Sequence, residues 1–280
     1  MKQPQVFDTP HYRALDVARA ELLREALGEF QAQLGLQTAW DIGCGVGTFS
    51  VLLKELGFQT RALDGRAGNV EEAARRVPGL DVRVGDVEDP ALPGLGAADL
   101  ALCLGLLYHL ENPFQAIRNL AQIAGKILVL ESMCTWDEKP VLYLLEEGAT
   151  EDQGLRYIAF YPSESCLIKM LYSAGFSRVY RFTRLPDNAD FQDQRDSTKR
   201  RTILVGSRCE LSSTFLAVAQ EPSAQFDLWK TAGARMPRPV ERAVTFFEKP
   251  WSEKLASLRR FFGVQVPMEP ASPVTPVKRT

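Results

Sequence analysis

Three glycines at alternate positions form a stretch of chain that could bind a ligand through bare backbone. Gly43, Gly45 and Gly47 permit a turn with positive φ, and their lack of side chains lets a ligand approach the main chain closely. The apolar run before the turn, residues 38–42, predicts a short buried strand, and the run after it, residues 49–56, has helical spacing. Strand, glycine turn and helix in this order are typical of the nucleotide-binding start of a doubly wound α/β sheet.

The spacing of these glycines argues against a dinucleotide site. The dinucleotide pattern G-x-G-x-x-G needs its third glycine at position 48, where this chain has Thr48. Asp41 stands two residues before the first glycine, and its carboxylate can offset positive charge on a ligand. A tight turn that binds nothing is the alternative for this fragment taken alone.

Acidic residues also end the next two predicted strands. Asp64 follows the strand-like residues 59–63, and Asp86, which precedes Val87, follows the strand-like residues 81–85. Carboxylates at such positions accept hydrogen bonds from ribose hydroxyls in dinucleotide-binding folds. A single acid of this kind is usually a solvated strand-end residue, but several in register with a glycine turn indicate a ligand site.

The pattern D-x-G-x-G-x-G that begins at Asp41 resembles motif I of the class I S-adenosylmethionine (SAM) methyltransferases. The resemblance implies that the turn cradles the amino-acid part and ribose of SAM, that Asp64 binds the ribose hydroxyls, and that Asp86 with Val87 holds the adenine. We therefore predict SAM as the cofactor, bound by Asp41, Gly43, Cys44, Gly45, Gly47, Asp64, Gly65, Asp86, Val87 and Leu104.

The composition of the chain excludes several other classes of protein. Its 280 residues, 45% of them hydrophobic, suffice for one large core, and a net charge of −2 gives no general attraction to nucleic acid or an anionic membrane. The first residues lack the apolar run of a signal peptide, no stretch suits a membrane span, and the five cysteines are scattered, so we expect a cytoplasmic protein. With two histidines and no Cys/His cluster, we expect no metal site.

Strands and helices continue to alternate along the rest of the chain. Further strands are predicted at 98–104, 126–130, 178–182 and 202–207, and further helices at 113–123 and 163–173. The last two strands form a hairpin, which gives a mostly parallel sheet its antiparallel strand. The expected fold class is α/β: a doubly wound, mostly parallel, seven-stranded Rossmann-like methyltransferase sheet with an antiparallel last strand, over residues 36–208.

A helical lead-in, residues 1–35, precedes this core. Its apolar residues share one side of a helix, which predicts an amphipathic element. Such helices often form a lid over the cofactor in the methyltransferases that the chain resembles, and this would bring Phe7, His11 and Tyr12 close to ligand. A helix that only packs on the sheet is the alternative.

Two further segments lie beyond the shared core pattern. Residues 133–161 form an insertion that we expect on the substrate side of the sheet. Residues 209–280 form a C-terminal extension, with one amphipathic helix at 252–262 and a Pro-rich, disordered end from residue 266.

His109 and Tyr108 are the candidate catalytic residues, because they follow the fourth strand at the edge where open α/β sheets bind ligands. Histidine titrates near neutral pH and suits a general base, and Tyr108 could orient a hydroxyl or stack on a substrate. His109 could instead only pin its loop, because methyl transfer from a sulfonium needs mostly alignment. Glu131, at the end of the fifth strand, is a second candidate, with a solvated acid as the alternative.

Motifs from residue 98 to residue 206 are similar to those of tRNA wobble-uridine carboxymethyltransferases and of saccharide and natural-product methyltransferases. They include Leu107-Tyr108-His109, Leu128-Val129-Leu130-Glu131, Phe160-Tyr161-Pro162-Ser163 and Ala174-Gly175-Phe176. The resemblance places Tyr161 and Ser163 near the substrate, so the predicted substrate-binding residues are Tyr12, Glu131, Tyr161 and Ser163. The long basic N-terminal extension of the tRNA enzymes is absent before the first strand, and the residues that would select a carboxylated SAM cannot be identified.

Three functions follow from these observations. The leading hypothesis is a SAM-dependent methyltransferase that acts on a small molecule or saccharide, most often at oxygen. The second is a tRNA methyl- or carboxymethyltransferase that uses basic residues between 178 and 208, although interleaved aspartates favour a solvated hairpin there. The third is a non-catalytic SAM-binding partner subunit. The sequence leaves open the acceptor and its reacting atom, the choice between SAM and carboxylated SAM, and the oligomeric state.

Overall fold

The computed structural model describes residues 6–148, 150, 152–192 and 199–222. Residues up to Pro222 belong to one unit, which contains the elements described below. The helix predicted at 252–262 and the disordered end predicted from residue 266 lie outside the described residues.

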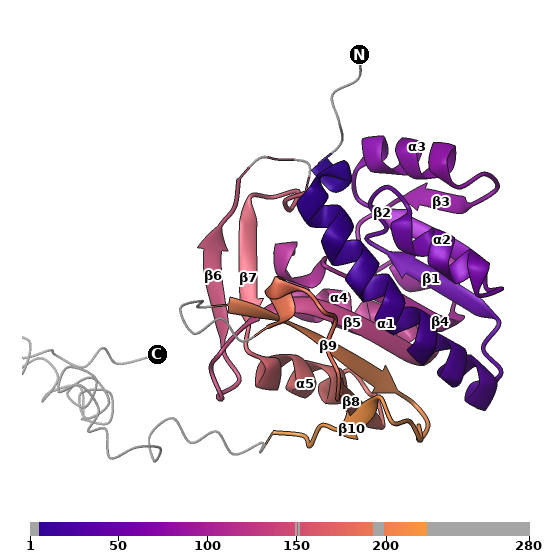
Figure 1. The fold of residues 1–280 in the computed structure, drawn as a ribbon. Coiled ribbons are helices and arrows are strands. Elements are labelled where there is room, and N and C mark those ends of the chain that lie inside the picture. Colours follow the sequence, from indigo (N-terminus) through magenta and orange to yellow (C-terminus); the bar gives the residue numbers. More distant parts are fainter. Residues whose placement is uncertain (1–5, 149, 151, 193–198, 223–280) are drawn as a thin grey trace, which may run out of the picture. The chain divides into compact units, whose positions relative to one another are not determined.

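A mixed eight-stranded sheet forms the centre of this unit (Figure 1). Its strand order is β10-β8-β9-β5-β4-β1-β2-β3, and the five strands from β5 to β3 run parallel. Strand β9 pairs antiparallel with both β5 and β8. The strands are β1 Thr38–Ile42, β2 Gln59–Asp64, β3 Asp81–Val84, β4 Ala98–Leu104, β5 Ala124–Thr135, β8 Arg178–Phe182, β9 Lys199–Ser207 and β10 Leu216–Val218.

This topology confirms the predicted mostly parallel sheet with an antiparallel late strand. The sheet has one strand more than the seven expected, because β10 adds to the edge beyond β8. Strand β10 comes from residues that the sequence analysis assigned to the C-terminal extension. Three residues are too short a run to stand out as a strand in the sequence, and only the edge of β8 gives them hydrogen-bond partners.

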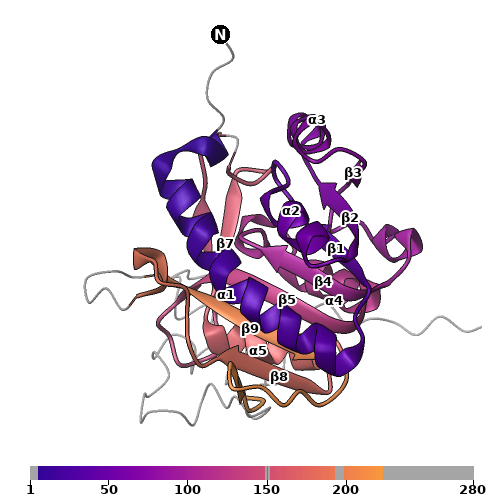
Figure 2. The same cartoon turned by 45° about the vertical axis from the view of Figure 1, so that its right-hand side comes forward.

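Helices cover both faces of the sheet (Figure 2). Apolar side chains of α1 and α2 pack on one face, and those of α4 and α5 pack on the other. The helices are α1 Pro10–Leu34, α2 Thr48–Glu55, α3 Ala67–Arg76, α4 Pro113–Ile123 and α5 Glu164–Ser173, with 3-10 turns η1 Val6–Asp8, η2 Leu92–Leu95, η3 Leu107–His109 and η4 Ala189–Phe191.

Helix α1 crosses the sheet diagonally in Figure 2 and buries a continuous apolar stripe. Leu15, Leu23 and Leu27 along this stripe are almost completely buried, and each such side chain stabilises the fold by roughly 1.5–3 kcal/mol. The helix ends at Gly35, which takes the left-handed conformation with φ of 59°. Residues 10–34 of the predicted lead-in therefore form one long helix that packs on the sheet.

The predicted insertion contains a two-stranded antiparallel hairpin, β6 Leu142–Glu146 and β7 Ile158–Pro162. Figure 1 shows it beside the sheet, near the N-terminal end of α1. These two strands were not predicted, because the run L-Y-L-L-E of β6 does not alternate between apolar and polar residues. In the structure all five residues of β6 are exposed.

Within the described part of the chain, no helix is long and apolar enough to cross a membrane. The same residues contain no group of three or more His, Cys, Asp or Glu side chains placed to hold a metal ion. All five cysteines are free thiols, and four of them are buried.

Candidate functional site

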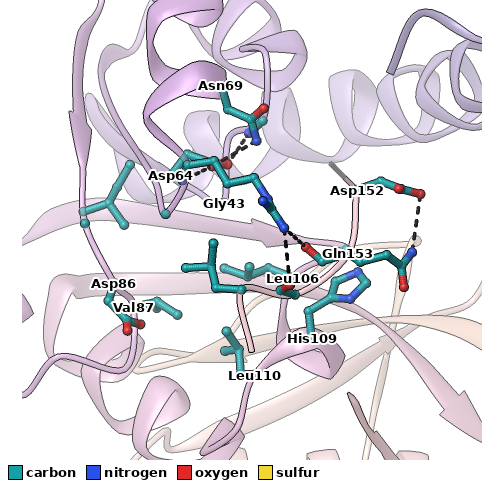
Figure 3. Close-up of a pocket in the computed structure, with 18 of the residues that line it drawn as sticks. Gly43, Asp64, Asn69, Asp86, Val87, Leu106, His109, Leu110, Asp152 and Gln153 are labelled. Atoms are coloured by element: carbon teal, nitrogen blue, oxygen red, sulfur yellow. Dashed lines mark hydrogen bonds between the residues drawn. The ribbon is translucent and has the colours of Figure 1, made fainter. Parts of the chain in front are cut away.

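Two cavities lie at the carboxyl edge of the parallel strands, and the glycine turn lines both of them. Figure 3 shows the first of them. They share Gly43, Gly45 and His109 in their walls, together with Phe7, Gly105 and Asp152. We call the first the strand-end cavity, because Asp64 and Asp86 line it, and the second the α1 cavity, because Tyr12, Asp16 and Arg19 line it.

The glycine turn depends on conformations that other residues rarely adopt. Gly43, Gly45 and Gly47 have φ of 73°, 52° and 89°. A Cβ on Gly43 would lie 2.8 Å from the Leu106 side chain, so the turns after β1 and β4 can approach each other only because this position is glycine. Gly47 caps the N-terminus of α2. Gly43 and Gly45 line both cavities, and Gly47 does not line either of them.

Asp64 ties the glycine turn to the end of β2. One carboxylate oxygen accepts the Gly45 backbone N–H at 2.9 Å, and the other accepts the Arg66 N–H at 2.9 Å and the Asn69 side-chain amide at 3.0 Å. Burial raises the pKa of Asp64 above its ordinary value, although these three donors oppose the rise. Asp64 and Asn69 border the strand-end cavity in Figure 3, so this carboxylate is available to a ligand as well as to the turn.

Asp86 and Val87 line the same cavity, at the end of β3 (Figure 3). One Asp86 oxygen accepts the Glu88 backbone N–H at 2.8 Å, and the other contacts an Arg156 guanidinium nitrogen at 3.3 Å. Val87 is buried and presents an apolar wall. An acceptor beside an apolar wall is suited to a purine ring that carries an exocyclic amine. Gly65 also lines this cavity, packed under Leu155.

Asp41 lies behind the glycine turn and outside the residues that line the two cavities. One of its oxygens accepts the Ser50 hydroxyl at 2.6 Å, and burial raises its pKa to about 7. Its predicted contact with the cofactor stays a prediction. Cys44 and Leu104 do line the α1 cavity.

A network of charges forms the floor of the α1 cavity. Glu131 was predicted to end the fifth strand, but β5 continues to Thr135, and Glu131 lies within it beside Leu104, the last residue of β4. Glu131 is completely buried, and its two oxygens accept hydrogen bonds from Arg19 at 2.9 Å and Arg201 at 2.8 Å. Arg19 also pairs with Asp16 at 2.5 Å, and Arg201 with Asp190 at 3.2 Å. We call these five residues the Glu131 network. Glu131 was predicted to contact substrate, and the structure places it beneath two arginines that themselves line the cavity.

Tyr108 and His109 form the turn η3 between the two cavities. The Tyr108 ring is buried, accepts a hydrogen bond from Arg201 at 3.3 Å, and packs edge-on against Tyr161 with 5.7 Å between ring centres. Burial raises the pKa of Tyr108, which keeps its hydroxyl protonated. His109 lines both cavities, and its Nδ1 lies 2.6 Å from a carboxylate oxygen of Glu147.

The remaining predicted substrate residues have different surroundings. Tyr12 lines the α1 cavity and donates its hydroxyl to Asp152 at 2.7 Å. Tyr161 does not line either cavity, and its ring packs against that of Tyr108. Ser163 is fully buried and caps helix α5, where its hydroxyl oxygen accepts the Cys166 N–H at 3.1 Å. The structure therefore brings Tyr12 to a cavity but gives Ser163 a capping role.

The segment 152–156 of the insertion closes over the strand-end cavity. The Arg66 guanidinium donates to the backbone carbonyls of Gln153 at 2.9 Å and Gly154 at 3.3 Å. From the other side, Arg156 contacts Asp86 and also Glu111 at 3.0 Å. The segment is thus held to the ends of both β2 and β3 and forms part of the cavity wall.

Sequence reasoning missed several residues that border the cavities or contact His109. Arg19 carried a usable signal: it lies four residues after Leu15 and four before Leu23, on the apolar stripe of the predicted helix, where a charge implies a buried partner. Asp152 and Glu147 carried no local signal, because nothing in the insertion's sequence predicts which strands its loop would return to.

Comparisons with known proteins agree with this geometry. Residues 40–126 match the methyltransferase domain family, over the segment that carries the glycine turn and both strand-end acids. The chain contains a class I SAM-dependent methyltransferase domain. The resemblance predicted from motif I is thereby confirmed.

Relatives of this methyltransferase domain fall into more than one group. The ubiquinone biosynthesis O-methyltransferase of Caulobacter vibrioides is 32% identical over 90 residues, which are 31% of this chain and 36% of that protein. The tRNA U34 carboxymethyltransferase of Aliivibrio fischeri is 32% identical over 149 residues, which are 50% of this chain and 44% of that protein. The chain thus spans less than half the length of each of these relatives.

Solved structures show the same fold. The N-terminal domain of EvdMO1 with S-adenosylhomocysteine (SAH) bound has a TM-score of 0.55 at 20% identity, covering 69% of this chain and 80% of that one. The sugar N-methyltransferase KedS8 of a Streptoalloteichus species has a TM-score of 0.51 at 17% identity, covering 75% of this chain and 95% of that one. At these identities the likeness concerns the fold, and it agrees with the Rossmann-like methyltransferase sheet described above.

Proposed function

We propose that this chain is an enzyme that transfers a methyl group from SAM to a hydroxyl oxygen of a small-molecule or saccharide acceptor. The observation that carries the proposal is the position of His109. It borders both the cavity lined by the strand-end acids and the cavity lined by α1, so a donor in the first and an acceptor in the second would meet beside its ring.

The residues of the strand-end cavity fit SAM. Asp64 offers carboxylate oxygens to the ribose hydroxyls, and Asp86 with Val87 offers an acceptor and an apolar wall to the adenine. Gly43 and Gly45 line the cavity with backbone that carries no side chain, against which the methionine part could lie. When bound, SAM supplies a methyl group on a sulfonium, which is already an activated electrophile, so the protein must chiefly align the acceptor.

His109 is the candidate base for an acceptor hydroxyl. A hydroxyl that attacks the methyl carbon must lose its proton, and an imidazole at that point can take it. The buried Tyr108 hydroxyl, held by Arg201, shapes the adjacent wall of the α1 cavity. If His109 only pinned its loop, it would take no proton from the acceptor. The general-base role and the loop-pinning role therefore predict different effects of a His109 substitution on turnover.

The charges around the α1 cavity favour SAM over a carboxylated SAM. Arg19 and Arg201, the two arginines in its wall, each pair with Glu131 and with one further aspartate. An additional carboxylate on the donor would have to compete with those partners, and the same holds for a phosphate on the acceptor. A neutral acceptor and a cationic donor fit better.

Binding of RNA on the face between residues 178 and 208 has less support. Arg181 and Arg200 both pair with Glu164, and Arg184 pairs with Glu25 at 2.7 Å. Arg201 is buried in the Glu131 network. Basic side chains that already contact carboxylates within the domain offer less to a phosphate backbone.

The proposal can be tested with purified protein in two stages. Calorimetry should first detect binding of SAM and SAH, and each should raise the melting temperature. Production of SAH should then be measured with a panel of acceptors: a catechol, a sugar glycoside, a nucleotide-linked sugar and bulk tRNA. SAH formation with a hydroxylated small molecule or sugar is expected. Turnover on tRNA alone would overturn the acceptor class, and SAM binding without turnover on any acceptor would favour a non-catalytic subunit.

A further inference from the structure

We infer that Glu147, from the insertion after β5, is a positioning residue that holds the ring of His109 with its Nε2 free to accept a proton. The inference rests on the proposed function, because it assigns a partner to the proposed base. It gives the insertion a part in the chemistry in addition to closing over the strand-end cavity.

The geometry of the pair is that of an oriented imidazole. A carboxylate oxygen of Glu147 lies 2.6 Å from His109 Nδ1, and the two side chains are 5% and 10% exposed. An ionised carboxylate only accepts hydrogen bonds, so the ring must carry a proton on Nδ1. The neutral ring then has its lone pair on Nε2, on the opposite side, which is the form a general base requires.

The Glu147 carboxylate is itself held in place. Its second oxygen accepts the Gly154 backbone N–H at 2.8 Å, and its own backbone N–H donates to the Tyr157 carbonyl at 2.9 Å. Gly154 packs so tightly against the His109 carbonyl and Glu147 that a Cβ there would collide with both. The segment that closes the strand-end cavity therefore also fixes the carboxylate that orients the histidine.

The Glu147–His109 pair gives the acceptor proton a place to go during methyl transfer. As the acceptor oxygen forms its bond to the methyl carbon, the carbon–sulfur bond breaks and its electron pair stays on sulfur, which leaves SAH. The acceptor proton moves to His109 Nε2, and the imidazolium that forms is stabilised by the Glu147 charge beside Nδ1. A glutamine at position 147 keeps the shape but removes that charge and can present its amide N–H to Nδ1, which favours the opposite tautomer.

The first test needs no acceptor. The chain has only two histidines, so nitrogen-15 spectra of labelled protein resolve His109, with a His11→Gln variant to assign the other ring. In the wild type at a pH where the ring is neutral, we expect the proton on Nδ1. Glu147→Gln should shift the population toward the Nε2–H form, and Glu146→Gln, the same change at the exposed neighbouring residue on β6, should leave it unchanged. An Nε2–H ring in the wild type, or an unchanged ring in Glu147→Gln, would overturn the inference.

The second test uses whichever acceptor the panel identifies. Glu147→Gln should lower kcat by about 10²-fold or more, while SAH affinity and the KM for SAM stay within about two-fold. In a His109→Asn background the same change should have almost no further effect on kcat, because the residue acts only through the ring. Equal losses in both backgrounds would refute the positioning role. If no acceptor is methylated at all, the proposed function fails, and the tautomer measurement still decides whether Glu147 orients His109.

Discussion

Glu131→Gln tests whether Glu131 supports the fold or contacts substrate. Glu131 has no exposed surface, and its two oxygens are 2.9 Å from Arg19 and 2.8 Å from Arg201, whose side chains are each only 6% exposed. Glutamine has nearly the same volume but no charge. The substitution therefore removes the negative charge that the two buried guanidinium groups share.

The expected loss of stability is large for a single substitution. Removing one partner from a buried ion pair typically costs about 3–5 kcal/mol, because the remaining charge stays buried without compensation. For a domain of this size about 1 kcal/mol corresponds to roughly 2–4 °C in melting temperature, so we expect a fall of roughly 6–20 °C. Aspartates 16 and 190 remain to offset part of the positive charge, which favours the lower half of that range.

The loss should also depend on pH. Burial alone would raise the pKa of Glu131, but the charges of Arg201 and Arg19 outweigh burial and hold it below the ordinary value of 4.5. A carboxylate whose pKa is lowered by folding stabilises the native state above its unfolded pKa and loses that contribution as the pH falls through the folded pKa. The difference between wild type and Glu131→Gln should therefore be full at pH 7 and shrink below about pH 4.5.

Thermal and urea unfolding at pH 7 measure this difference, with Glu55→Gln as the matched control. Glu55 pairs with Arg24 at 2.5 Å, but both side chains are about half exposed, so the control should lose no more than about 1 kcal/mol. A Glu131→Gln protein as stable as the control, with weakened acceptor binding, would refute the structural role and favour the substrate contact predicted from the sequence.

Three further predictions concern the cofactor site and the surface. Asp64→Asn should weaken SAM binding by about 10- to 100-fold in calorimetry, since charge-assisted hydrogen bonds to ribose are worth about 1.5–3 kcal/mol; a change under two-fold would contradict the assignment. Burial raises the pKa of Asp41 to about 7, above its unfolded value of 3.8, so the contribution of Asp41 to the free energy of unfolding falls as the pH rises from about 4 to 7. Asp41→Asn should therefore become more stable relative to wild type over that range. A constant stability difference in urea unfolding would argue against the raised pKa. Bulk tRNA should bind only weakly at low salt, and tight binding with a steep salt dependence that Arg200→Ala flattens would support the RNA alternative instead.

Local sequence determined the glycine turn and the acids that follow β2 and β3. Gly43, Gly45 and Gly47 fall within five residues, and only glycine readily takes the positive φ that each of them has. Asp64 and Asp86 follow short runs that are recognisable as strand-like. Because parallel neighbouring strands end at the same edge of a sheet, the approximate position of the cofactor site was predictable without the structure.

The tertiary structure decided what the other charged residues do. Arg201 belongs to a basic run that favoured a solvated hairpin, yet strand β9 pairs with β5 and brings Arg201 beside Glu131 in the interior. Glu131 and Arg19 are 112 positions apart, and His109 and Glu147 are 38 apart. Whether an acid is solvated, bound to an arginine or oriented toward a histidine depends on burial and on where distant segments return. Helical or strand periodicity predicts neither the burial of a charged residue nor its distant partner. The partners of Glu131 and His109 beside the glycine turn could therefore be identified only from the tertiary structure.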